Sequence, residues 1–458
     1  MHEFLVSAVA FIVLIGFMVV VHELGHFIVA KLCGVRVEAF SFGFGPRLFG
    51  FKHGETDYKV CLLPLGGFVK MTGESAEQNL EAPGSQAQVL PDDPGAFTSH
   101  PRWQRMLIGL AGPTSNFVLA MALMVFYFGW INEVQSVEVK STTVEWVTPG
   151  SAAAQAGILP GDVIQRFDSV GNPDWDAIYV HSRLNANQPV PMTVERNGNT
   201  LALTLHIPPS AKNDDFDPGD EGLLPQYQFG PIAVSEVQPD MPAEHAGLRP
   251  GDAIAAVDGH AFHTTNTLLA YMQTGQGKPI QLTVLRHGEM LYMTANPAKL
   301  DTEWKLGFAP VPPSYRNLPL PLNQAVSKSV DFCRDNSTLI VEVLKRLFTH
   351  RVSISQLQGP VGMARMAGDA AEMKGWQPKF GLAAMISLNL GIVNLLPFPI
   401  LDGGMILFLL IESLLRHDIN VLVKERIYQA AFMVLMAFMV FIIFSDVTKL
   451  PMFTHIKP

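Results

Sequence analysis

The first residues of this chain that could do chemistry are His22, Glu23 and His26, which form a His-Glu-x-x-His motif. The motif lies in the apolar run 19–29, whose composition is typical of a buried helix. Residues four apart share one face of a helix, so both imidazole rings can bind one Zn²⁺ while Glu23 lies beside the water that the metal activates. Ionisable groups inside a membrane-spanning helix usually mark a functional site. The motif therefore predicts the core of a zinc peptidase.

A catalytic zinc keeps three protein ligands and an open position, so the two histidines require a third donor elsewhere in the chain. Asp402 is our candidate, in the run NLLPFPILDGG at residues 394–404. Two prolines break the helix there, and Gly403 and Gly404 allow unusual backbone conformations. A rise of about 1.5 Å per residue places His22 roughly 27 Å across a hydrocarbon core of about 30 Å. A later span would deliver Asp402 to the same boundary.

The composition indicates a membrane protein with soluble inserts. The chain has 458 residues, of which 48% are hydrophobic and only 16% charged, and its mean hydropathy is +0.23. A net charge of −9, with no cluster of Lys and Arg, argues against a nucleic-acid partner. Cys33, Cys61 and Cys333 form neither a zinc-ligand spacing nor an even disulfide set, so we assign them no role.

We expect a multi-pass α-helical membrane protein with four transmembrane helices, at about residues 4–32, 106–131, 378–398 and 427–446. The first apolar run has no small-residue cleavage site, so we interpret it as a retained span rather than a signal peptide. Its downstream flank carries Lys31 and Arg36 and its upstream flank carries no Lys or Arg, which places the N-terminus outside. Residues 313–377 predict amphipathic helices on the outer surface, and 405–415 a short interfacial helix.

The soluble insert repeats itself at an offset of 90 residues. AGILPGDVI at 156–164 matches AGLRPGDAI at 246–254, and TVERNG at 193–198 matches TVLRHG at 283–288. The repeated signature resembles that of bacterial PDZ domains, which bind extended peptide ends by adding a strand to a sheet edge. We therefore expect an N-terminal membrane core at 1–131, PDZ (α+β) domains at 132–221 and 222–312, and a C-terminal membrane core at 378–458.

Peptide hydrolysis is the expected reaction, with Glu23 taking a proton from the attacking water and passing it to the leaving amine. A substrate helix must be unwound first, because its carbonyls are already hydrogen-bonded. Short strands in the first loop could hold it extended, and their candidate contacts are Tyr58, Val60, Leu62, Gly66 and Gly67. Asn394 could bind the extended substrate backbone or pack between helices, and Asn116 could act in catalysis or in an interhelical hydrogen bond.

Together these motifs resemble the site-2 protease family of intramembrane zinc metalloproteases. The resemblance rests on the His-Glu-x-x-His motif, Asn394-x-x-Pro397-x-x-x-x-Asp402-Gly403, Gly112-Pro113-x-x-Asn116 and PLGGFV at 64–69, and it covers the whole chain. It implies cleavage of single-span membrane proteins, such as a pre-clipped anti-sigma factor in envelope stress signalling, and of remnant signal peptides.

The resemblance also implies a place in the cell. The protein would lie in the inner membrane of a Gram-negative bacterium, with both termini and the PDZ domains periplasmic and the active site near the cytoplasmic side. It further implies that about 58–70 form a membrane-associated, re-entrant β-hairpin element.

Two alternatives stay open at this point. A non-catalytic scaffold could present the two PDZ domains and hold zinc for structure, but no Cys or His lies near Asp402 to fill the fourth position of a structural site. A zinc-dependent transporter could also place polar residues at helix breaks, although the two halves of the chain show no inverted repeat. The sequence leaves undecided whether the PDZ pair recruits peptides or excludes bulky substrates.

Overall fold

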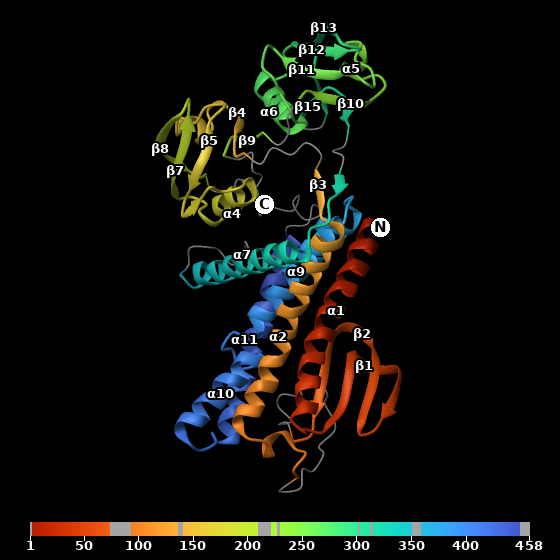
Figure 1. Ribbon diagram of the computed structural model, residues 1–458, viewed down its shortest axis with the longest axis vertical. Helices are drawn as coiled ribbons and strands as arrows, with labels where there is room; N and C mark the ends of the chain where they lie inside the picture. The colour runs from red at the N-terminus through yellow and green to blue at the C-terminus, as the bar shows by residue number, and fades with distance from the viewer. Residues whose placement is uncertain are drawn as a thin grey trace. The chain divides into compact units, whose positions relative to one another are not determined.

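The computed structural model describes residues 2–73, 93–135, 141–208, 221–226, 230–300, 303–311, 315–349 and 359–448. The chain divides into two compact units (Figure 1). One, the helical unit, comprises Met1–Glu133 and Asn317–Pro458, and the other, the module unit, is the insertion Val134–Arg316. Because the insertion leaves and re-enters the helical unit, segments far apart in the sequence can build one site there.

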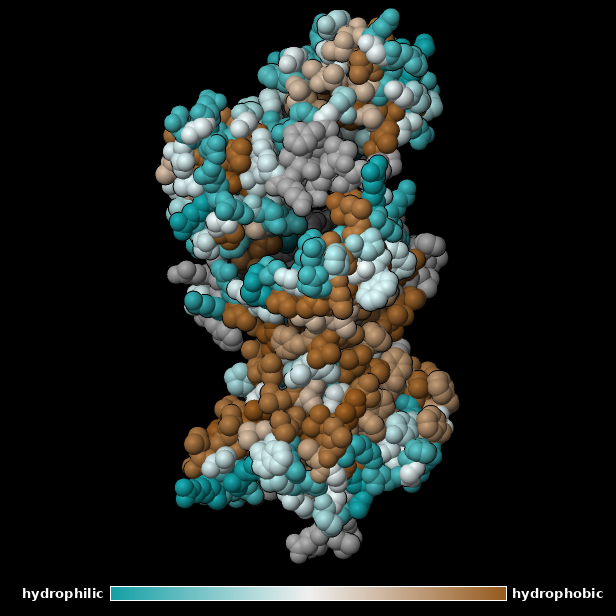
Figure 2. Space-filling model, viewed as in Figure 1, coloured by the Kyte–Doolittle hydropathy of each residue, from teal (hydrophilic) through white to brown (hydrophobic). Residues whose placement is uncertain are grey.

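Three helices among the described residues are long and apolar enough to cross a membrane, over Val6–Leu32, Arg102–Ile131 and Leu422–Phe444. They lie in α1 (His2–Leu32), in α2 (Arg102–Phe126) with its π-helical continuation η2 (Tyr127–Ile131), and in α11 (Val421–Thr448). Hydrophobic residues cover the middle of the visible face of the helical unit (Figure 2). The predicted multi-pass helical class is thus confirmed for three spans, and the second begins at Arg102 rather than near residue 106.

The predicted third span is the 18-residue helix α9 (Gln377–Asn394). It is outside the set of three because Lys379, Asn389 and Asn394 lower its hydropathy. It nevertheless packs along α2, with Gly391 against Phe117 and the Pro113 carbonyl.

The remaining helices of this unit are shorter or amphipathic. A short 3-10 helix, η1 (Phe97–Ser99), precedes α2, and the region predicted as amphipathic surface helices contains α7 (Leu322–Phe348) and α8 (Pro360–Glu372). α7 buries Ala325 and Ser329 on one face, while most of its charged residues are exposed. The predicted short helix at 405–415 is α10 (Asp402–Leu415), which begins three residues earlier and so includes the candidate zinc ligand.

Two long antiparallel strands, β1 (Val37–His53) and β2 (Thr56–Met71), fold back on themselves beside α1 (Figure 1). Residues 39–42 pair with 57–60 on one side and with 67–70 on the other, and residues 47–53 pair with 56–61. The result is four rows, in which 56–61 is an interior row and 67–71 an edge. No strand in the described part of the chain pairs with the outer side of that edge.

The module unit contains two α+β modules of the same design, as the 90-residue repeat predicts. The first consists of β4 (Val144–Val147), α3 (Ala152–Gln155), β5 (Val163–Phe167), β6 (Val170–Gly171), α4 (Trp175–Leu184), β7 (Pro189–Arg196), β8 (Asn199–His206) and β9 (Leu223–Pro225). The second consists of β10 (Ile232–Val237), α5 (Pro242–His245), β11 (Ala253–Val257), α6 (Thr265–Gly275), β12 (Ile280–Arg286), β13 (Glu289–Ala295), β14 (Ala298–Leu300), β15 (Glu303–Lys305) and β16 (Phe308–Pro310). Two further strands, β3 (Glu133–Gln135) and β17 (Tyr315–Asn317), lie where the insertion begins and ends.

An ion pair recurs at the same place in both modules. Arg196 Nε lies 2.7 Å from Asp162, and Arg286 Nε lies 2.7 Å from Asp252, with both carboxylates almost fully buried. Hydrogen bonding to Arg286 lowers the pKa of Asp252 below its ordinary value. The aspartate of each Pro-Gly-Asp signature is therefore a buried anchor for the next hairpin.

The boundary between the modules differs from the one drawn at 221/222. β9 pairs with β4, and Leu223 belongs to the buried core of the first module, so that module extends through Pro225. A repeat fixes the length of its unit but not the point at which each unit starts, because any cut at the same offset gives the same self-similarity.

Candidate active site

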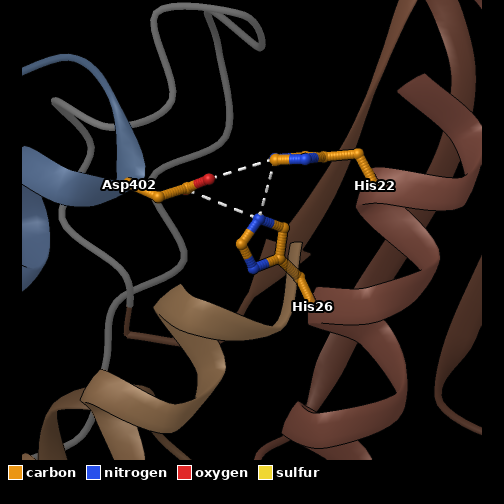
Figure 3. Close-up of side chains that lie close together, drawn as sticks. All are labelled: His22, His26 and Asp402. Atoms are coloured by element: carbon orange, nitrogen blue, oxygen red, sulfur yellow. Dashed lines mark hydrogen bonds and ion pairs between the residues drawn. The ribbon is translucent and has the colours of Figure 1, made fainter. Parts of the chain in front are cut away.

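Three side chains from two distant parts of the chain meet at one point (Figure 3). His22 and His26 project from one face of α1, and Asp402 is the first residue of α10. His22 Nε2 lies 3.0 Å from one carboxylate oxygen of Asp402, and His26 Nε2 lies 3.4 Å from the other. The two Nε2 atoms are 3.2 Å apart.

This donor set fits zinc. Ligand atoms about 2.0–2.1 Å from a tetrahedral zinc are separated by about 3.3 Å. The two Nε2 atoms here are 3.2 Å apart, and each lies 3.0 or 3.4 Å from one of the two Asp402 oxygens. Two imidazoles and one carboxylate are also the ligand types of a catalytic rather than a structural zinc site, since they leave a fourth position open. No fourth His or Cys joins this cluster in the described part of the chain.

Each histidine is oriented through its other ring nitrogen. His26 Nδ1 lies 2.8 Å from the carbonyl oxygen of Ile108, so the ring donates its Nδ1 hydrogen there and presents Nε2 to the metal. His22 Nδ1 lies 3.0 Å from the side-chain amide of Asn116. Both partners belong to α2, so the packing of α2 on α1 aims the two ligands.

Asn116 can serve His22 only with its amide oxygen toward the ring. In this structure its nitrogen faces Nδ1 and its buried oxygen has no hydrogen-bond partner among the described residues. A half-turn of the amide pairs that oxygen with the Nδ1 hydrogen of His22, which leaves Nε2 unprotonated for the metal.

Glycines bring the two helices close enough for this arrangement. A methyl group at Gly112 would lie 2.2 Å from His26 Nε2 and 2.7 Å from His22 Nε2, so a larger residue would occupy the space of the ligands. A methyl group at Gly25, between the two histidines, would lie 2.4 Å from the Ala111 carbonyl oxygen. Ser115 adds a hydrogen bond from its hydroxyl to the Val21 carbonyl, at 2.8 Å.

The turn at 395–401 places Asp402. Our expectation of unusual backbone conformations at Gly403 and Gly404 is wrong, because neither has a positive φ and both lie in α10. They are needed for close approach instead. A methyl group at Gly403 would lie 2.3 Å from the Leu395 carbonyl oxygen, and one at Gly404 would lie 2.1 Å from the Phe398 carbonyl oxygen.

Glu23 lies beside the β element. The Cβ position of Gly67 is 3.4 Å from Glu23 Cγ and 2.7 Å from the Ser41 carbonyl oxygen, so a side chain at residue 67 would collide with the sheet beside Glu23. Of the two glycines proposed as substrate contacts, Gly67 thus lies next to the candidate base, and Gly66 lies against the Phe44 ring.

The other proposed substrate contacts are not equivalent. Asn394 ends α9, and its amide nitrogen lies 3.4 Å from His22 Nε2, so it joins the metal site. Tyr58 and Val60 lie in the interior row, where each is paired on both sides, and Tyr58 packs its ring against Phe27 and Phe51. Leu62 is 54% exposed beyond that row. Of the proposed substrate contacts, Gly67 lies near Glu23 and Asn394 lies near a candidate ligand.

Sequence reasoning missed the roles of Ile108 and Gly112 in the site. The Ile108 group is a backbone carbonyl, which no residue type could have signalled. The Gly-Pro-x-x-Asn motif was the signal for Gly112 and Asn116, but the spacing alone does not say which helix face they occupy.

We expect Asn116→Ala to weaken zinc binding by about 10- to 100-fold, because His22 would lose the group that fixes its ring and tautomer. Asn116→Asp should retain zinc, since a carboxylate oxygen accepts the same hydrogen. Ser387→Ala is the matched control, because that hydroxyl bonds only the backbone carbonyl of Asn116, at 2.9 Å. Competition with a chelator measures the affinity of each variant, and equal affinities for Asn116→Ala and the control would contradict the assignment.

This chain is similar to known proteins over most of its length. The model of peptidase family M50 matches residues 10–438. The regulator of sigma-E protease RseP of Escherichia coli strain K12 is 33% identical over 98% of this chain and 100% of its own length. RseP of Salmonella typhimurium is 34% identical over 96% of this chain and 98% of its own length. The PDZ domain of a Listeria monocytogenes SdrC-like protein matches 19% of this chain and 93% of its own, at 20% identity and a TM-score of 0.18.

Proposed function

This chain belongs to peptidase family M50, and from that premise we propose that His22, His26 and Asp402 hold its catalytic Zn²⁺ and that Glu23 is its general base. The protein is an intramembrane zinc metalloprotease of the site-2 type. The observation that supports this assignment is that two imidazole nitrogens and the Asp402 carboxylate, all possible zinc ligands, lie within 3.4 Å of one another in the helical unit.

The chain's own residues divide the work of hydrolysis. Zinc, when bound, polarises the scissile carbonyl and acidifies water to a pKa of about 7. Glu23 accepts a proton from the attacking water and donates it to the leaving amine, which ends the reaction with a free amine and a carboxylate. The α2 contacts hold both imidazoles in one tautomer, so no reorientation of the rings is needed during turnover.

We propose that the substrate binds as an extended strand along residues 66–70. Most of this segment belongs to the edge row 67–71, which pairs with β1 on one side only, and Gly67 lies beside Glu23. Main-chain hydrogen bonds along a sheet edge hold an unwound segment without regard to its side chains. Asn394, at the end of α9, supplies an amide that binds a carbonyl or N–H group of the same segment.

We further propose that α9 is a fourth span and that the N-terminus lies outside the cytoplasm. Basic residues then fall on one side of the membrane, at Lys31 in the last turn of α1, at Arg36 just after it, and at Lys424 and Arg426 in the first turns of α11. In this topology the modules are periplasmic and the metal site lies near the cytoplasmic side of a bacterial inner membrane.

The substrates in this proposal are single-span membrane proteins, including an anti-sigma factor that another protease has already clipped, and remnant signal peptides. The anti-sigma factor is proposed because the E. coli and Salmonella relatives are named as regulators of sigma-E. The two modules bind peptide ends by strand addition. A non-catalytic scaffold is disfavoured by the open fourth position, and a transporter by the base beside the metal ligands.

The test is cleavage by the purified full-length protein in detergent of a tagged single-span substrate, in its trimmed and untrimmed forms. We expect the trimmed form to be cut, cleavage to stop when a chelator removes zinc, and activity to return when zinc is restored. Cleavage that persists without zinc would refute a metalloprotease mechanism, and zinc binding without any cleavage would favour the scaffold.

A further inference from the structure

The chain leaves the helical unit after Glu133 and returns at Asn317, and these two points are bonded together. Asn132 donates from its side-chain amide to the Leu318 carbonyl at 2.6 Å and accepts the Leu318 N–H at its own carbonyl at 3.1 Å. Leu320 N–H bonds the Phe128 carbonyl at 2.9 Å. The two ends at which the helical unit is interrupted are therefore bonded to each other beside η2.

Glu133 joins this attachment point to α9. One carboxylate oxygen accepts the backbone N–H groups of Trp376, at 2.6 Å, and Gln377, at 3.1 Å. Trp376 is the N-cap residue of α9, and Gln377 is its first residue. The side chain of Trp376 makes no capping hydrogen bond, and Pro378 has no N–H, so Glu133 binds the amides that need a partner at this helix end. A carboxylate at this end also interacts favourably with the helix dipole.

Glu133 is itself held in place. Its backbone N–H bonds the Tyr127 hydroxyl at 3.1 Å. Gly375, at φ +94°, leaves room for the carboxylate, because a methyl group there would lie 2.8 Å from its oxygen. Aromatic side chains pack beside Glu133. The ring centroid of Phe380 lies 5.7 Å from that of Phe126 and 5.9 Å from that of Tyr127.

α9 connects this junction to the metal site. At 1.5 Å per residue, a helix of 18 residues is about 27 Å long, and it ends at Asn394 beside His22. The turn after it leads directly to Asp402. If α9 slid or rotated against α2, Asn394 and Asp402 would both move. A contact that holds the first turn of α9 therefore helps to keep both residues in place.

We propose that Glu133 is a positioning residue for the metal site, which fixes α9 against α2 at the point where the module unit is attached. This proposal rests on the proposed function for the roles of Asn394 and Asp402. Displacement of a catalytic group by about 1 Å can lower turnover by about 100-fold, so a distant clamp on α9 has a measurable effect.

The experiment uses the full-length protein in lipid nanodiscs at saturating zinc. For a trimmed single-span substrate, we expect Glu133→Ala to lower kcat by about 10- to 100-fold with KM changed by less than about twofold, because substrate contacts remain and geometry is lost. Glu133→Gln should recover most of the loss, since its amide oxygen accepts the same two N–H groups. Amide exchange should be faster in Glu133→Ala both at 376–380 and at 390–402.

Lys379→Met is the matched control. Lys379 Nζ donates to the Met373 and Gly375 carbonyls, at 2.6 and 2.8 Å, so the variant loosens the same helix start without removing the Glu133 bonds. It should speed exchange at 376–380 alone and keep kcat within about twofold of the native value. Equal kcat for Glu133→Ala and native protein, no recovery in Glu133→Gln, or equal damage in the control would overturn the proposal. Exchange is measured without turnover, so it decides the role of Glu133 even if the native protein proves not to be a peptidase.

Discussion

Glu23→Gln should lower the rate of peptide cleavage by about 10²- to 10⁴-fold, the usual contribution of a general base, while zinc stays bound. Glutamine has nearly the same size and shape as glutamate but cannot accept a proton from water. None of the three ligand groups changes, so the metal content of the purified protein should equal that of the native chain. Cleavage of the trimmed single-span substrate and metal analysis on the same preparation give the two values.

The matched control for this change is Glu55→Gln. That carboxylate is 46% exposed and pairs with Lys31 away from the metal ligands, so the same chemical substitution should leave activity unchanged. Native-like cleavage by Glu23→Gln would remove Glu23 from the mechanism. Loss of both zinc and activity would instead indicate a role in holding the site together.

Asp402→Ala should lower zinc affinity by more than the 10- to 100-fold expected for an outer partner such as Asn116, because it removes one of three ligands. Activity at limiting zinc should fall with occupancy, because zinc supplies the chemistry of the site. Isothermal titration with zinc measures the affinity, and cleavage of the trimmed substrate at the same zinc concentrations measures the activity. Saturating zinc should restore occupancy but only part of the activity.

A carboxylate just beyond the other end of α10 provides the control. Asp418 is 68% exposed and pairs with Arg102 at 2.7 Å, so Asp418→Ala should bind zinc as the native protein does. Full zinc occupancy in Asp402→Ala at limiting metal would mean that another group is the third ligand.

The sequence alone determined the local part of this site. The spacing of His22 and His26 places them on a shared helix face, because residues four apart lie on the same face of any α-helix. The need for a third donor, and the choice of Asp402, followed from zinc chemistry and from the depth of the spans. The repeat, the helical membrane class and three of the spans also follow from composition and self-similarity, which require no knowledge of packing.

The tertiary structure decided everything that depends on which groups become neighbours. The partners that orient the imidazoles are a backbone carbonyl and an amide on α2, and only the close approach of α2 to α1 at Gly25 and Gly112 selects them. Strand pairing is equally non-local.

Because β1 and β2 fold back on themselves, Tyr58 lies in an interior row and Gly67 at an edge. Because β9 pairs with β4, the first module extends beyond the boundary predicted from the repeat. The bond from Glu133 to the start of α9 spans more than 240 positions. No local pattern encodes such a contact, because it forms only when distant helices pack.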